Sequence, residues 1–530
     1  MAKVMLYYNT VKNMKFSQVF NRVRIKLGKG CTLGTTPKAD IGSIQIVESP
    51  ADLDFDPVFL SRFPVEELME NKITILHSSK NMDWTTSWSF DDKSALWNFN
   101  LHYFEYLFPL IKSWKDTGDD VYLNKSVEII NSWIDANKPG NTPGWCSYPT
   151  ALRIISWISW YSYASEAISE DFRYKFLNSL HKQFVYLANH LEKDILGNHY
   201  FEDLKSLVIA SLFFKDDAVF NKALKDFKAE CKEEILPDGM HFELSPMYHK
   251  IIFEGILRIV VALRDVGIND HEIEFYIQSM LDVAYSFESG LERVPLFNDG
   301  GNNVAKSLDA LVIVAVSLGY VPHFKAQLKN SGFYIFQKII SGKEWKLIVD
   351  AGQPGPKYNP GHAHCDAMSY ELFCNGKPIS VNCGTFSYQC KERDFFRSTQ
   401  AHNTVMIEGT DQSQCWGAFR LAKRSSVKVL DVSDNSIVME LKDSNGKMCI
   451  RKITIDENCV VVSDKSTDLR LDVFVHIATP VNIVTSVVKE EIVQPYAPDY
   501  GVKQDIICYR LSNIGEIVHS IQLGSAMFGT

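Results

Sequence analysis

Residues 151–168 read ALRIISWISWYSYASEAI, and their apolar side chains recur at every third or fourth position. This is the period of an amphipathic helix, whose apolar face packs against other helices. The same period returns in YKFLNSLHKQFVYLANHLEK (174–193) and in KIIFEGILRIVVALRDVG (250–267). Many such helices in series, joined by short turns that contain Gly, Pro or Asp, predict an all-α domain over residues 96–330.

The pattern changes near residue 331, where apolar and polar residues begin to alternate. Asn-Gly pairs at 375–376 and 445–446 separate strand-like runs, and this dipeptide favours a hairpin turn. Several short strands with such turns predict an antiparallel β-sandwich over residues 331–530. Residues 1–95 are mixed and weakly periodic, and we expect them to pack on the helical domain. The predicted fold class is therefore an α+β multidomain protein.

The composition is that of a folded globular protein, with 46% hydrophobic and 22% charged residues. It excludes a largely disordered chain, a collagen-like fibre and a disulfide-dense miniprotein. Aromatic residues reach 12%, which weakly favours carbohydrate binding because flat rings stack on sugars. The net charge of −9 provides no basic field for nucleic acid, so we expect no nucleic-acid partner.

The cysteines and the first residues bear on the compartment. None of the eleven cysteines forms a C-x-x-C pair, so no zinc knuckle or thioredoxin-type motif is predicted. Free thiols at this density favour a reducing compartment. Residues 1–30 carry no secretory signal pattern, and no apolar run is long enough to span a bilayer. We therefore expect a cytoplasmic protein without a membrane span, or a periplasmic one if the true start lies upstream.

The densest polar cluster, NPGHAHCDAMSYELF (359–373), opens the β part of the chain. On a strand, His362, His364 and Asp366 would share one face, because side chains alternate with a period of two. Two imidazoles on one face can bind a metal ion, or one of them can transfer protons. The alternative is a pair of ordinary surface histidines, since H-x-H alone is common.

A second cluster, RDFFRSTQAHNTVMIEG (393–409), adds His402 to the two imidazoles of the same predicted domain. Arg393 and Arg397 come just before this histidine. Taken alone, the segment also fits an ordinary loop followed by a strand. It gains weight because it supplies a third imidazole near the first pair.

Two helix starts carry polar residues that suit chemistry. In LGNHYFEDLKS (196–206), a helix would make His199 and Glu202 neighbours one turn apart, with Asn198 beside them. A plain helix cap is the alternative role for this Asn.

In FELSPMYHKIIFEG (242–255), Ser245 and Pro246 predict a helix start. Tyr248 would then lie in the first turn, where free N–H groups stabilise nearby negative charge. A tyrosine at such a position often only packs, but at a domain cleft it can exchange protons.

Together and in this order, these segments resemble the heparinase II/III-like family of polysaccharide lyases and its alginate-lyase relatives. The resemblance covers roughly residues 95–410 and implies an incomplete (α/α) toroid followed by an antiparallel β-sandwich, with the active site between them. The matching segments are W-N-F-N-L-H-Y-F (97–104), W-C-S-Y-P-T-A-L-R-I-I-S-W-I (145–158), G-N-H-Y-F-E (197–202), E-L-S-P-M-Y-H (243–249), G-H-A-H-C-D (361–366) and F-R-S-T-Q-A-H-N-T-V (396–405).

The resemblance also implies a reaction, the β-elimination of a uronic acid polymer. The proton on C5 is removed, the bond to the 4-oxygen breaks, and an unsaturated sugar remains. That proton is barely acidic beside a carboxylate, so a lyase needs donors or cations that neutralise the carboxylate. Asn198 and His199 match family residues in this role, with Glu202 available to orient His199.

The acid and base of the reaction are implied in the same way. Tyr248 matches the family's catalytic tyrosine, which can serve once nearby positive charge lowers its pKa. His362 matches the imidazole that acts as base or contacts the substrate. Tyr388, in GTFSY, stands where alginate-lyase relatives carry a second catalytic tyrosine.

The expected partner is a polysaccharide or oligosaccharide that contains uronic acid, such as a glycosaminoglycan, alginate or bacterial exopolysaccharide. Arg153, Arg393 and Arg397 are candidates for a basic lining of the site. The net charge of −9 argues against a heavily sulfated polymer, so we expect sparse sulfation or none.

A zinc site is also implied by the resemblance. His364 and His402 match two of the family's three zinc ligands. The third is usually an Asp in a segment like I-D-x-G, where this chain has V-N-C-G and places Asn382. A neutral amide binds Zn²⁺ less strongly than a carboxylate does. The expected ion would be mainly structural.

Two other functions stay open on the sequence. A glycoside hydrolase on a similar toroid would need two carboxylates that flank the scissile bond, and Glu202, Glu243, Asp299 and Asp366 are available. A non-catalytic carbohydrate-binding or exopolysaccharide-assembly protein could keep a lyase scaffold. The Asn at 382 and the lack of a signal pattern favour this last reading, whereas the intact polar motifs oppose it.

Overall fold

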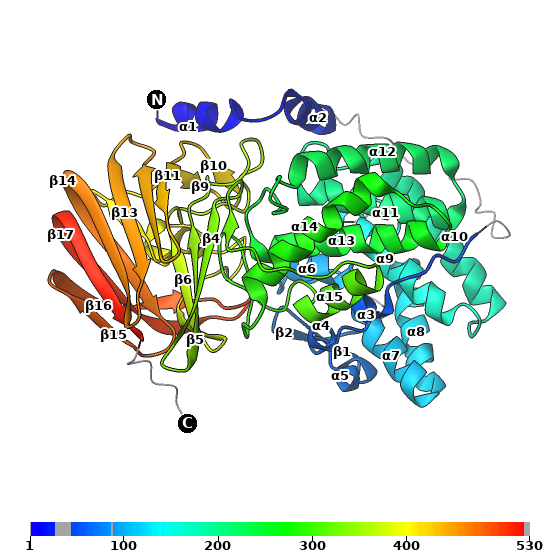
Figure 1. Ribbon diagram of the computed structural model, residues 1–530. Helices are drawn as coiled ribbons and strands as arrows, with labels where there is room; N and C mark the ends of the chain where they lie inside the picture. Colours follow the sequence, from blue (N-terminus) through cyan, green and yellow to red (C-terminus); the bar gives the residue numbers. More distant parts are fainter. Residues whose placement is uncertain (1, 27–43, 86–87, 141, 524–530) are drawn as a thin grey trace.

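The computed structural model describes residues 2–26, 44–85, 88–140 and 142–523 (Figure 1). Helices come first along the chain and strands second, in two lobes that lie side by side. The predicted order of an α domain followed by a β domain is confirmed. The sheet of the second lobe starts at Gln327, slightly before the boundary expected at residue 331.

The helical lobe consists of helices packed in two rows. They are α6 (Ala95–Leu101), α7 (Leu107–Thr117), α8 (Asp120–Ala136), α9 (Ser147–Ala164), α10 (Glu170–Asn189), α11 (Asn198–Phe214), α12 (Asp217–Glu234), α13 (Pro246–Asp265), α14 (His271–Glu288) and α15 (Leu308–Ser317). In one row, α7, α9, α11, α13 and α15 contact one another in chain order, while α8, α10, α12 and α14 pack outside them. This alternation is an incomplete (α/α) toroid.

The central helices of the inner row are largely buried. Most residues of α11 and α13 are buried, and Trp157 and Trp160 of α9 are fully enclosed. Ser245 caps α13, with its Oγ 3.3 Å from the Tyr248 backbone N–H, as the sequence predicts.

The segment before the toroid contains short elements. They are α1 (Ala2–Val11), α2 (Phe16–Lys26), α3 (Ala51–Asp54), α4 (Pro57–Leu60), α5 (Val65–Met69), β1 (Lys72–Ile75) and β2 (Ser78–Asn81). From α3 to β2 the chain packs on the toroid. Residues 27–43 lie outside the described residues. In contrast to the expectation, α1 rests on the β lobe, where the Trp416 indole N–H donates to Thr10 Oγ1 over 3.0 Å.

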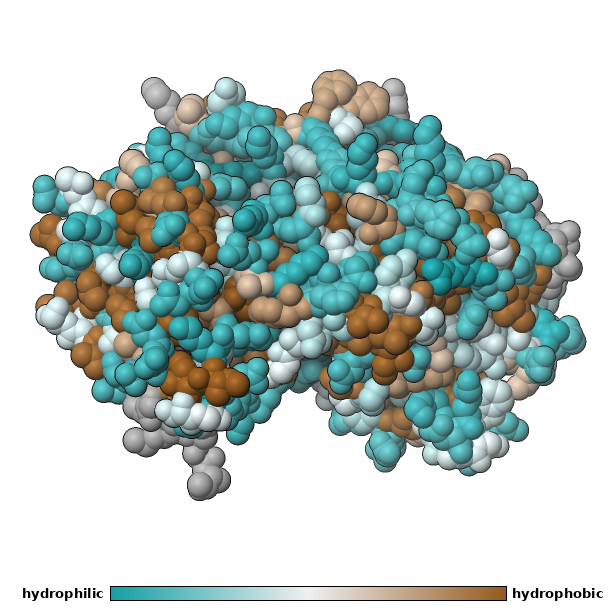
Figure 2. Space-filling view, in the orientation of Figure 1, coloured by the Kyte–Doolittle hydropathy of each residue, from teal (hydrophilic) through white to brown (hydrophobic). Residues whose placement is uncertain are grey.

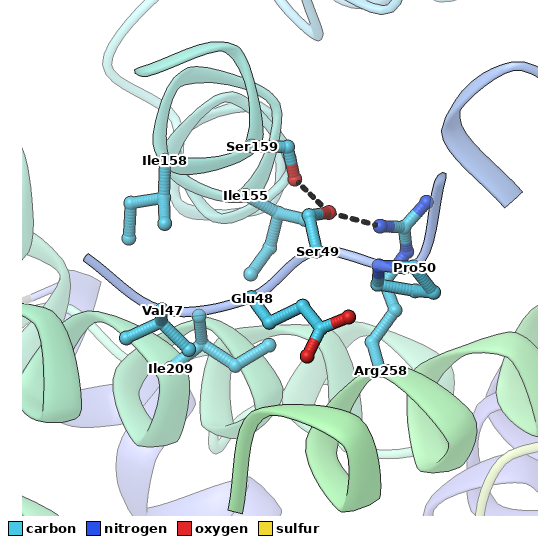
Figure 3. A pocket seen from close by; sticks show the side chains of 9 residues that line it. All are labelled: Val47, Glu48, Ser49, Pro50, Ile155, Ile158, Ser159, Ile209 and Arg258. Carbon is cyan, nitrogen blue, oxygen red and sulfur yellow. Dashed lines mark hydrogen bonds between the residues drawn. The ribbon is translucent and has the colours of Figure 1, made fainter. Parts of the chain in front are cut away.

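Residues 47–50 cross the toroid and line a small pocket against α9, α11 and α13 (Figure 3). Ser49 Oγ lies 2.7 Å from Ser159 Oγ and accepts from Arg258 over 3.3 Å. None of the predicted site residues lines this pocket. The pocket is therefore part of the packing contact between residues 47–50 and the toroid.

The β lobe is an antiparallel sandwich made from one hydrogen-bonded network. Its strands are β3 (Gln327–Leu328), β4 (Phe333–Ile340), β5 (Lys343–Asp350), β6 (Tyr370–Cys374), β7 (Lys377–Ser380), β8 (Val405–Ile407), β11 (Ser426–Val432), β12 (Ser436–Lys442), β13 (Met448–Ile455), β14 (Cys459–Ile477), β15 (Asn482–Thr485), β16 (Val488–Tyr496) and β17 (Gln504–Gln522). The main order is β11-β12-β13-β14-β7-β6-β5-β4-β3. Distant strands share one core, since Trp345 of β5 and Met439 of β12 belong to the same buried cluster.

The predicted hairpins are confirmed in this lobe. Asn375 and Gly376 join β6 to β7 with φ angles of 46° and 79°, the left-handed values that a tight hairpin needs. Asn445 and Gly446 lie between β12 and β13. A shorter pair, β9 (Cys415–Trp416) and β10 (Arg420–Leu421), stands apart from the main network.

Apolar side chains hold the two lobes against each other. Phe287 of α14 and Phe297 pack on Phe333 of β4, with ring centroids 4.9 and 5.3 Å apart. The contact brings the chain after α14 against the loop between β5 and β6, where several predicted site residues lie. Among the described residues, no helix combines the length and apolar character needed to cross a membrane.

A buried ion pair stabilises the sandwich, and its removal gives a first prediction about stability. Arg451 of β13 contacts Asp464 of β14 over 2.8 and 2.9 Å, and also donates to the carbonyls of Met368 and Asn403. Arg451→Met would leave the Asp464 charge buried without a partner. We expect the free energy of unfolding to fall by about 3–5 kcal/mol, measured by urea denaturation of the β signal in circular dichroism.

The matched control is Lys503→Met, which removes an exposed pair with Glu392 at 3.0 Å in the same lobe. We expect this change to cost less than about 1 kcal/mol, because water screens an exposed pair. Equal losses in the two variants would contradict a bracing role for Arg451.

Candidate functional site

A buried carboxylate, Asp299, gathers the site from both lobes. It follows α14 and accepts hydrogen bonds from His362 Nδ1 and His364 Nε2, each over 2.9 Å. Arg393 meets it with both terminal nitrogens, one of them over 2.8 Å. Burial alone would raise the pKa of Asp299, but Arg393 and the two imidazoles hold that pKa well below its usual range. Asp299 is therefore a fixed negative charge.

Three phenols form a hydrogen-bonded row beside this carboxylate. The Tyr248 hydroxyl lies 2.6 Å from that of Tyr388, which lies 2.6 Å from that of Tyr500. The Tyr248 ring also packs on the His362 ring with centroids 4.0 Å apart. The structure thus brings together Tyr248, His362 and Tyr388, which the resemblance implied as catalytic residues.

The electrostatic setting of Tyr248 differs from the sequence expectation. We expected positive charge to lower its pKa. Instead, burial, together with the charges of Tyr500 and Asp299, raises the pKa of Tyr248 well above its ordinary value. The main physical reason is burial, which disfavours the charged phenolate. The phenol is therefore protonated and suited to donate a proton.

A second group lies at the start of α11. The His199 ring packs on Tyr148 with centroids 4.4 Å apart, and its Nδ1 lies 2.9 Å from Glu192 Oε2. Burial opposes the charged ring, yet the charge and hydrogen bond of Glu192 raise the pKa of His199 above its usual value. Asn198, in the first turn of α11, is buried as well.

Gly197 precedes this helix in a conformation that other residues avoid, with φ 62° and ψ −149°. A Cβ atom there would lie 2.9 Å from Glu243 Oε1 and closer still to the Asn359 amide. Glycine, and not Asn198, thus holds the cap position of α11. The absence of a side chain lets the start of α11 approach the β lobe.

Glu202 does not orient His199 as expected. It is fully buried in α11 and forms an ion pair with Lys205, one turn further along the same helix. Burial raises the pKa of Glu202, and Lys205 opposes that rise. The ring nitrogen of His199 contacts Glu192 instead, because Glu192 lies in the loop just before α11, close to the first turn of that helix.

Glu243 occupies the space between the two groups. Its Oε2 lies 3.9 Å from His362 Nε2 and 3.9 Å from His241 Nδ1, beyond hydrogen-bond distance. The side chain is buried, and neither oxygen has a hydrogen-bond partner in the described part of the chain. Burying a carboxylate without a hydrogen-bond partner costs free energy. Packing alone therefore does not explain why a glutamate stands at this position.

Two of the three arginines expected to line the site, Arg153 and Arg397, are buried and structural. Arg153 is fully buried in α9, where it donates to Gln183, Thr150 and the His102 carbonyl, and it stacks over Trp133. Its donors are thus taken up inside the toroid. The expectation of substrate contact fails there because the apolar helix pattern places this residue in the core.

Arg397 is also fully buried, and the carbonyls of the site loops accept all its hydrogen bonds. It donates to Ala363 over 2.9 and 3.1 Å, and to Gly417 and Ala418 over 3.1 and 3.3 Å. Arg397 therefore positions the loop that carries His362 and His364 instead of meeting substrate.

The two histidines implied as zinc ligands face each other. His364 Nδ1 lies 3.1 Å from His402 Nε2. The opposite nitrogens face acceptors, the Asp299 carboxylate and the Ser398 carbonyl, so they carry the hydrogens. Burial lowers the pKa of His364 to about 4. Two lone pairs of neutral rings therefore point at one another, an arrangement that a cation between them would relieve.

The third implied ligand fits less well. Asn382 Oδ1 accepts from the Asn403 backbone N–H over 3.1 Å, and its Nδ2 faces Ser369. Across the described residues, no group of three or more His, Cys, Asp and Glu side chains is arranged to hold a metal ion. The chain thus offers two nitrogen donors and an amide oxygen that is already in use.

Comparison with known proteins places this architecture. A family model described as "Heparinase II/III N-terminus" matches residues 7–317, and "Heparinase II/III-like, C-terminal" matches residues 322–485. The chain belongs to the heparinase II/III family. The resemblance drawn from the sequence motifs is confirmed.

Heparinase II/III relatives with curated descriptions are distant. A heparin-sulfate lyase of Pedobacter heparinus is 26% identical over 365 residues, which are 62% of this chain and 54% of that protein. The match thus spans about half the length of that relative. A heparin-sulfate lyase of Bacteroides thetaiotaomicron is 21% identical over 481 residues, 80% of this chain and 68% of the relative.

Heparinase II/III structures also share the fold. A crystal structure of heparinase III superposes with a TM-score of 0.70 at 16% identity, over 94% of this chain and 89% of that one. At this identity the likeness concerns the fold alone. It supports the toroid followed by a sandwich that the contacts and strand order describe.

The sequence did not identify three residues that belong to this heparinase II/III site, namely Tyr500, Glu192 and Asp299. Tyr500 follows Tyr388 by 112 residues, and no motif surrounds it. Glu192 precedes the motif at 197–202 by only a few residues, where its spacing was the available signal. Asp299 was considered only as a hydrolase carboxylate, although the Asn-Asp-Gly-Gly stretch around it marks a turn near the end of the predicted helical domain.

The pairing of His199 with Glu192 gives a prediction about pH. A histidine with a raised pKa stabilises the fold fully below about pH 6.5, and this contribution is lost as pH rises through the folded pKa. Glu192→Gln removes the attraction and keeps the burial that opposes the charge. We expect the pKa of His199 to fall, measured by NMR titration of ¹³C-labelled histidine rings.

The signal is assigned from its loss in His199→Gln. Glu233→Gln is the control, because this acidic residue pairs with Lys15 and not with a histidine. An unchanged titration of His199 in the Glu192 variant would show that this carboxylate does not set its charge.

Proposed function

We propose that this heparinase II/III protein is a lyase that cleaves a uronate-containing polysaccharide by β-elimination. The observation that carries the proposal is the fixed pair of Asp299 and His362 beside the protonated Tyr248. The curated relatives described as heparin-sulfate lyases support a glycosaminoglycan as the substrate class. The acidic chain favours a sparsely sulfated polymer, with alginate and bacterial exopolysaccharide as the other candidates.

His362 is proposed as the base. Its Nδ1 faces the Asp299 carboxylate, so this nitrogen carries the hydrogen and leaves a lone pair on Nε2. The carboxylate also stabilises the imidazolium that forms when Nε2 takes the C5 proton. Glu243 is too distant to bond that nitrogen in the free protein, so Nε2 stays available to substrate.

Tyr248 is proposed as the acid that protonates the leaving 4-oxygen. Its raised pKa keeps the hydroxyl protonated at neutral pH. Tyr388 is hydrogen-bonded to it and Tyr500 to Tyr388, so a proton can be replaced along the row after each turnover. The ring of Tyr248 packs on that of His362, which supports a role for the two residues in the same reaction.

Asn198 and His199 are proposed to neutralise the substrate carboxylate. Both lie in the first turn of α11, where unpaired N–H groups favour an anion. Glu192 raises the pKa of His199 and so favours its charged form. These interactions gain strength as negative charge develops at the carboxylate, which is what lowers the barrier.

The hydrolase alternative has less support. Of its four candidate carboxylates, Glu202 pairs with Lys205, Asp299 with Arg393, and Asp366 accepts from the Asn298 backbone over 3.0 Å. Within the described residues, Glu243 is the one of these four with no hydrogen bond and no ion-pair contact shorter than 3.9 Å. Hydrolysis needs two carboxylates with separate roles at one bond. A binding protein would not need an acid and a base held this close.

The decisive experiment follows ultraviolet absorbance while the protein acts on a panel of uronate polysaccharides. The unsaturated product absorbs, and a hydrolysis product does not. We expect Tyr248→Phe to lower the rate by about 10²–10⁴-fold, because general acid catalysis contributes that much. Tyr388 keeps Tyr500 as a partner in this variant, so no buried hydroxyl is orphaned.

Tyr174→Phe is the matched control, since this tyrosine is exposed on α10 and far from the site in the fold. Its rate should equal that of the unchanged protein. New reducing ends without absorbance would favour the hydrolase. Tight binding without either product would favour the binding protein.

We further propose that His364 and His402 bind a structural Zn²⁺, with Asn382 as a weak third ligand. Two nitrogen ligands of zinc at ~2.0–2.1 Å lie ~3.3 Å apart in tetrahedral geometry, close to the spacing of these rings. When bound, the ion would hold the loop with His362 against the segment that carries His402. It takes no part in the proton transfers proposed above.

Metal analysis tests this site on protein purified without a histidine tag. We expect about one zinc per chain, lost in His402→Ala because one of two strong donors is removed. His271→Ala is the control, since this histidine is exposed at the start of α14. Zinc-free protein from zinc-supplied cells would argue against the ion.

A further inference from the structure

The helices α1 and α2 turn apolar side chains outward and polar side chains toward the body of the protein. A surface helix normally turns its apolar side inward. Here the buried side chains are Asn9 and Gln18, which is 2% exposed, while Phe16 is 84% exposed. The other exposed large apolar residues of the two helices are Val4, Met5, Tyr7, Tyr8, Val11, Phe20, Val23 and Ile25.

The exposed residues form a stripe on each helix. In α2, Phe16, Phe20 and Val23 have the spacing i, i+4, i+7, which places them within an arc of about 60°. Val4, Tyr8 and Val11 repeat the same spacing in α1. The two stripes, named here the outer stripes, consist of these six residues.

Positive charge accompanies the outer stripes. Residues 2–26 contain no Asp or Glu, although the whole chain carries a net charge of −9. On the helical wheel of α2, Arg24 and Lys26 flank the stripe on its two sides, and Lys12 lies next to the stripe of α1. All three are exposed. Apolar residues bordered by basic ones are the pattern of helices that lie in a lipid interface.

Polar contacts fix both helices to the body and keep the stripes outward. Thr10 binds the Trp416 indole over 3.0 Å, Lys15 pairs with Glu233, and Gln18 donates to the Ile195 carbonyl over 3.1 Å. Figure 1 places α1 over the sandwich and α2 over the toroid along one edge of the molecule. Figure 2 shows hydrophobic surface, in tan, at this edge near α2.

We propose that the outer stripes bind the surface of an anionic lipid bilayer. The apolar side chains would enter the interface, while Lys12, Arg24 and Lys26 meet acidic headgroups. A soluble acidic polysaccharide fits less well, because it offers charge but no apolar interior for Phe16 and Phe20. A second copy fits less well too, since a two-fold contact would bring the same basic residues together.

Vesicle sedimentation with the full chain tests the proposal. The probes are vesicles of phosphatidylcholine alone and of phosphatidylcholine with phosphatidylglycerol in a ratio of about 7:3. We expect binding to the anionic vesicles at low salt, and weaker binding at high salt because charge attraction is screened. Neutral vesicles should bind much less.

Two variants separate the apolar and the basic contributions. The double variant Phe16→Ser with Phe20→Ser should weaken binding by about tenfold or more, since both apolar anchors are lost. Arg24→Gln with Lys26→Gln should weaken it and reduce its salt dependence. Phe275→Ser is the control, because this residue is 76% exposed on α14, and should bind as the unchanged protein does.

Other results would overturn the proposal. Equal binding by the Phe16 and Phe20 double variant would show that the stripes do not enter the lipid. A dimer in sedimentation equilibrium that this variant converts to monomer would assign the stripes to a contact between copies. Binding to a soluble uronate polymer that depends on Phe16 and Phe20 would assign them to substrate. Lyase activity and unfolding midpoint should stay unchanged, because all substituted residues are exposed.

Discussion

One buried negative charge, that of Asp299, organises the centre of this protein. A carboxylate without water needs cationic or hydrogen-bonding partners, and Asp299 obtains them from three separate parts of the β lobe: His362 and His364, Thr385 and Arg393. Because the chain after α14 supplies this residue, the same contacts also join the helical lobe to the sandwich. The folding requirement and the orientation of the proposed base are therefore one constraint.

The loops around this charge are held by backbone carbonyls as much as by side chains. Arg397 donates hydrogen bonds to the carbonyls of Ala363 and of the turn at 417–418, and Arg451 donates to those of Met368 and Asn403. Both guanidiniums are fully buried. Planar groups with several fixed donors can satisfy carbonyls that no strand pairs, which explains why irregular chain can stay ordered here. Rigid loops in turn keep His362 and Tyr248 in ring contact.

The sequence predicted the architecture well because periodicity reports which faces are buried. The α-then-β order, the cap at Ser245 and the hairpin at Asn375-Gly376 all follow from local patterns. The motifs also located Tyr248, His362 and Tyr388, which meet in the structure. The roles of Arg153 and Glu202 were predicted wrongly, because the sequence does not show whether a charged side chain faces the site or the interior. Both are buried within the helical lobe. Tyr500 could not be found, since only folding brings it to Tyr388.

Gly197 shows how a residue without a functional group can limit what the chain tolerates. Its backbone angles suit glycine alone, and a Cβ would collide with Asn359 of the β lobe and Glu243 of the helical lobe. Any replacement must therefore either change the start of α11 or separate the lobes there. In a library of random variants, substitutions at this position should be as depleted as those of the proposed acid and base. A screen for activity alone could not tell that Gly197 sets a distance and takes no part in the chemistry.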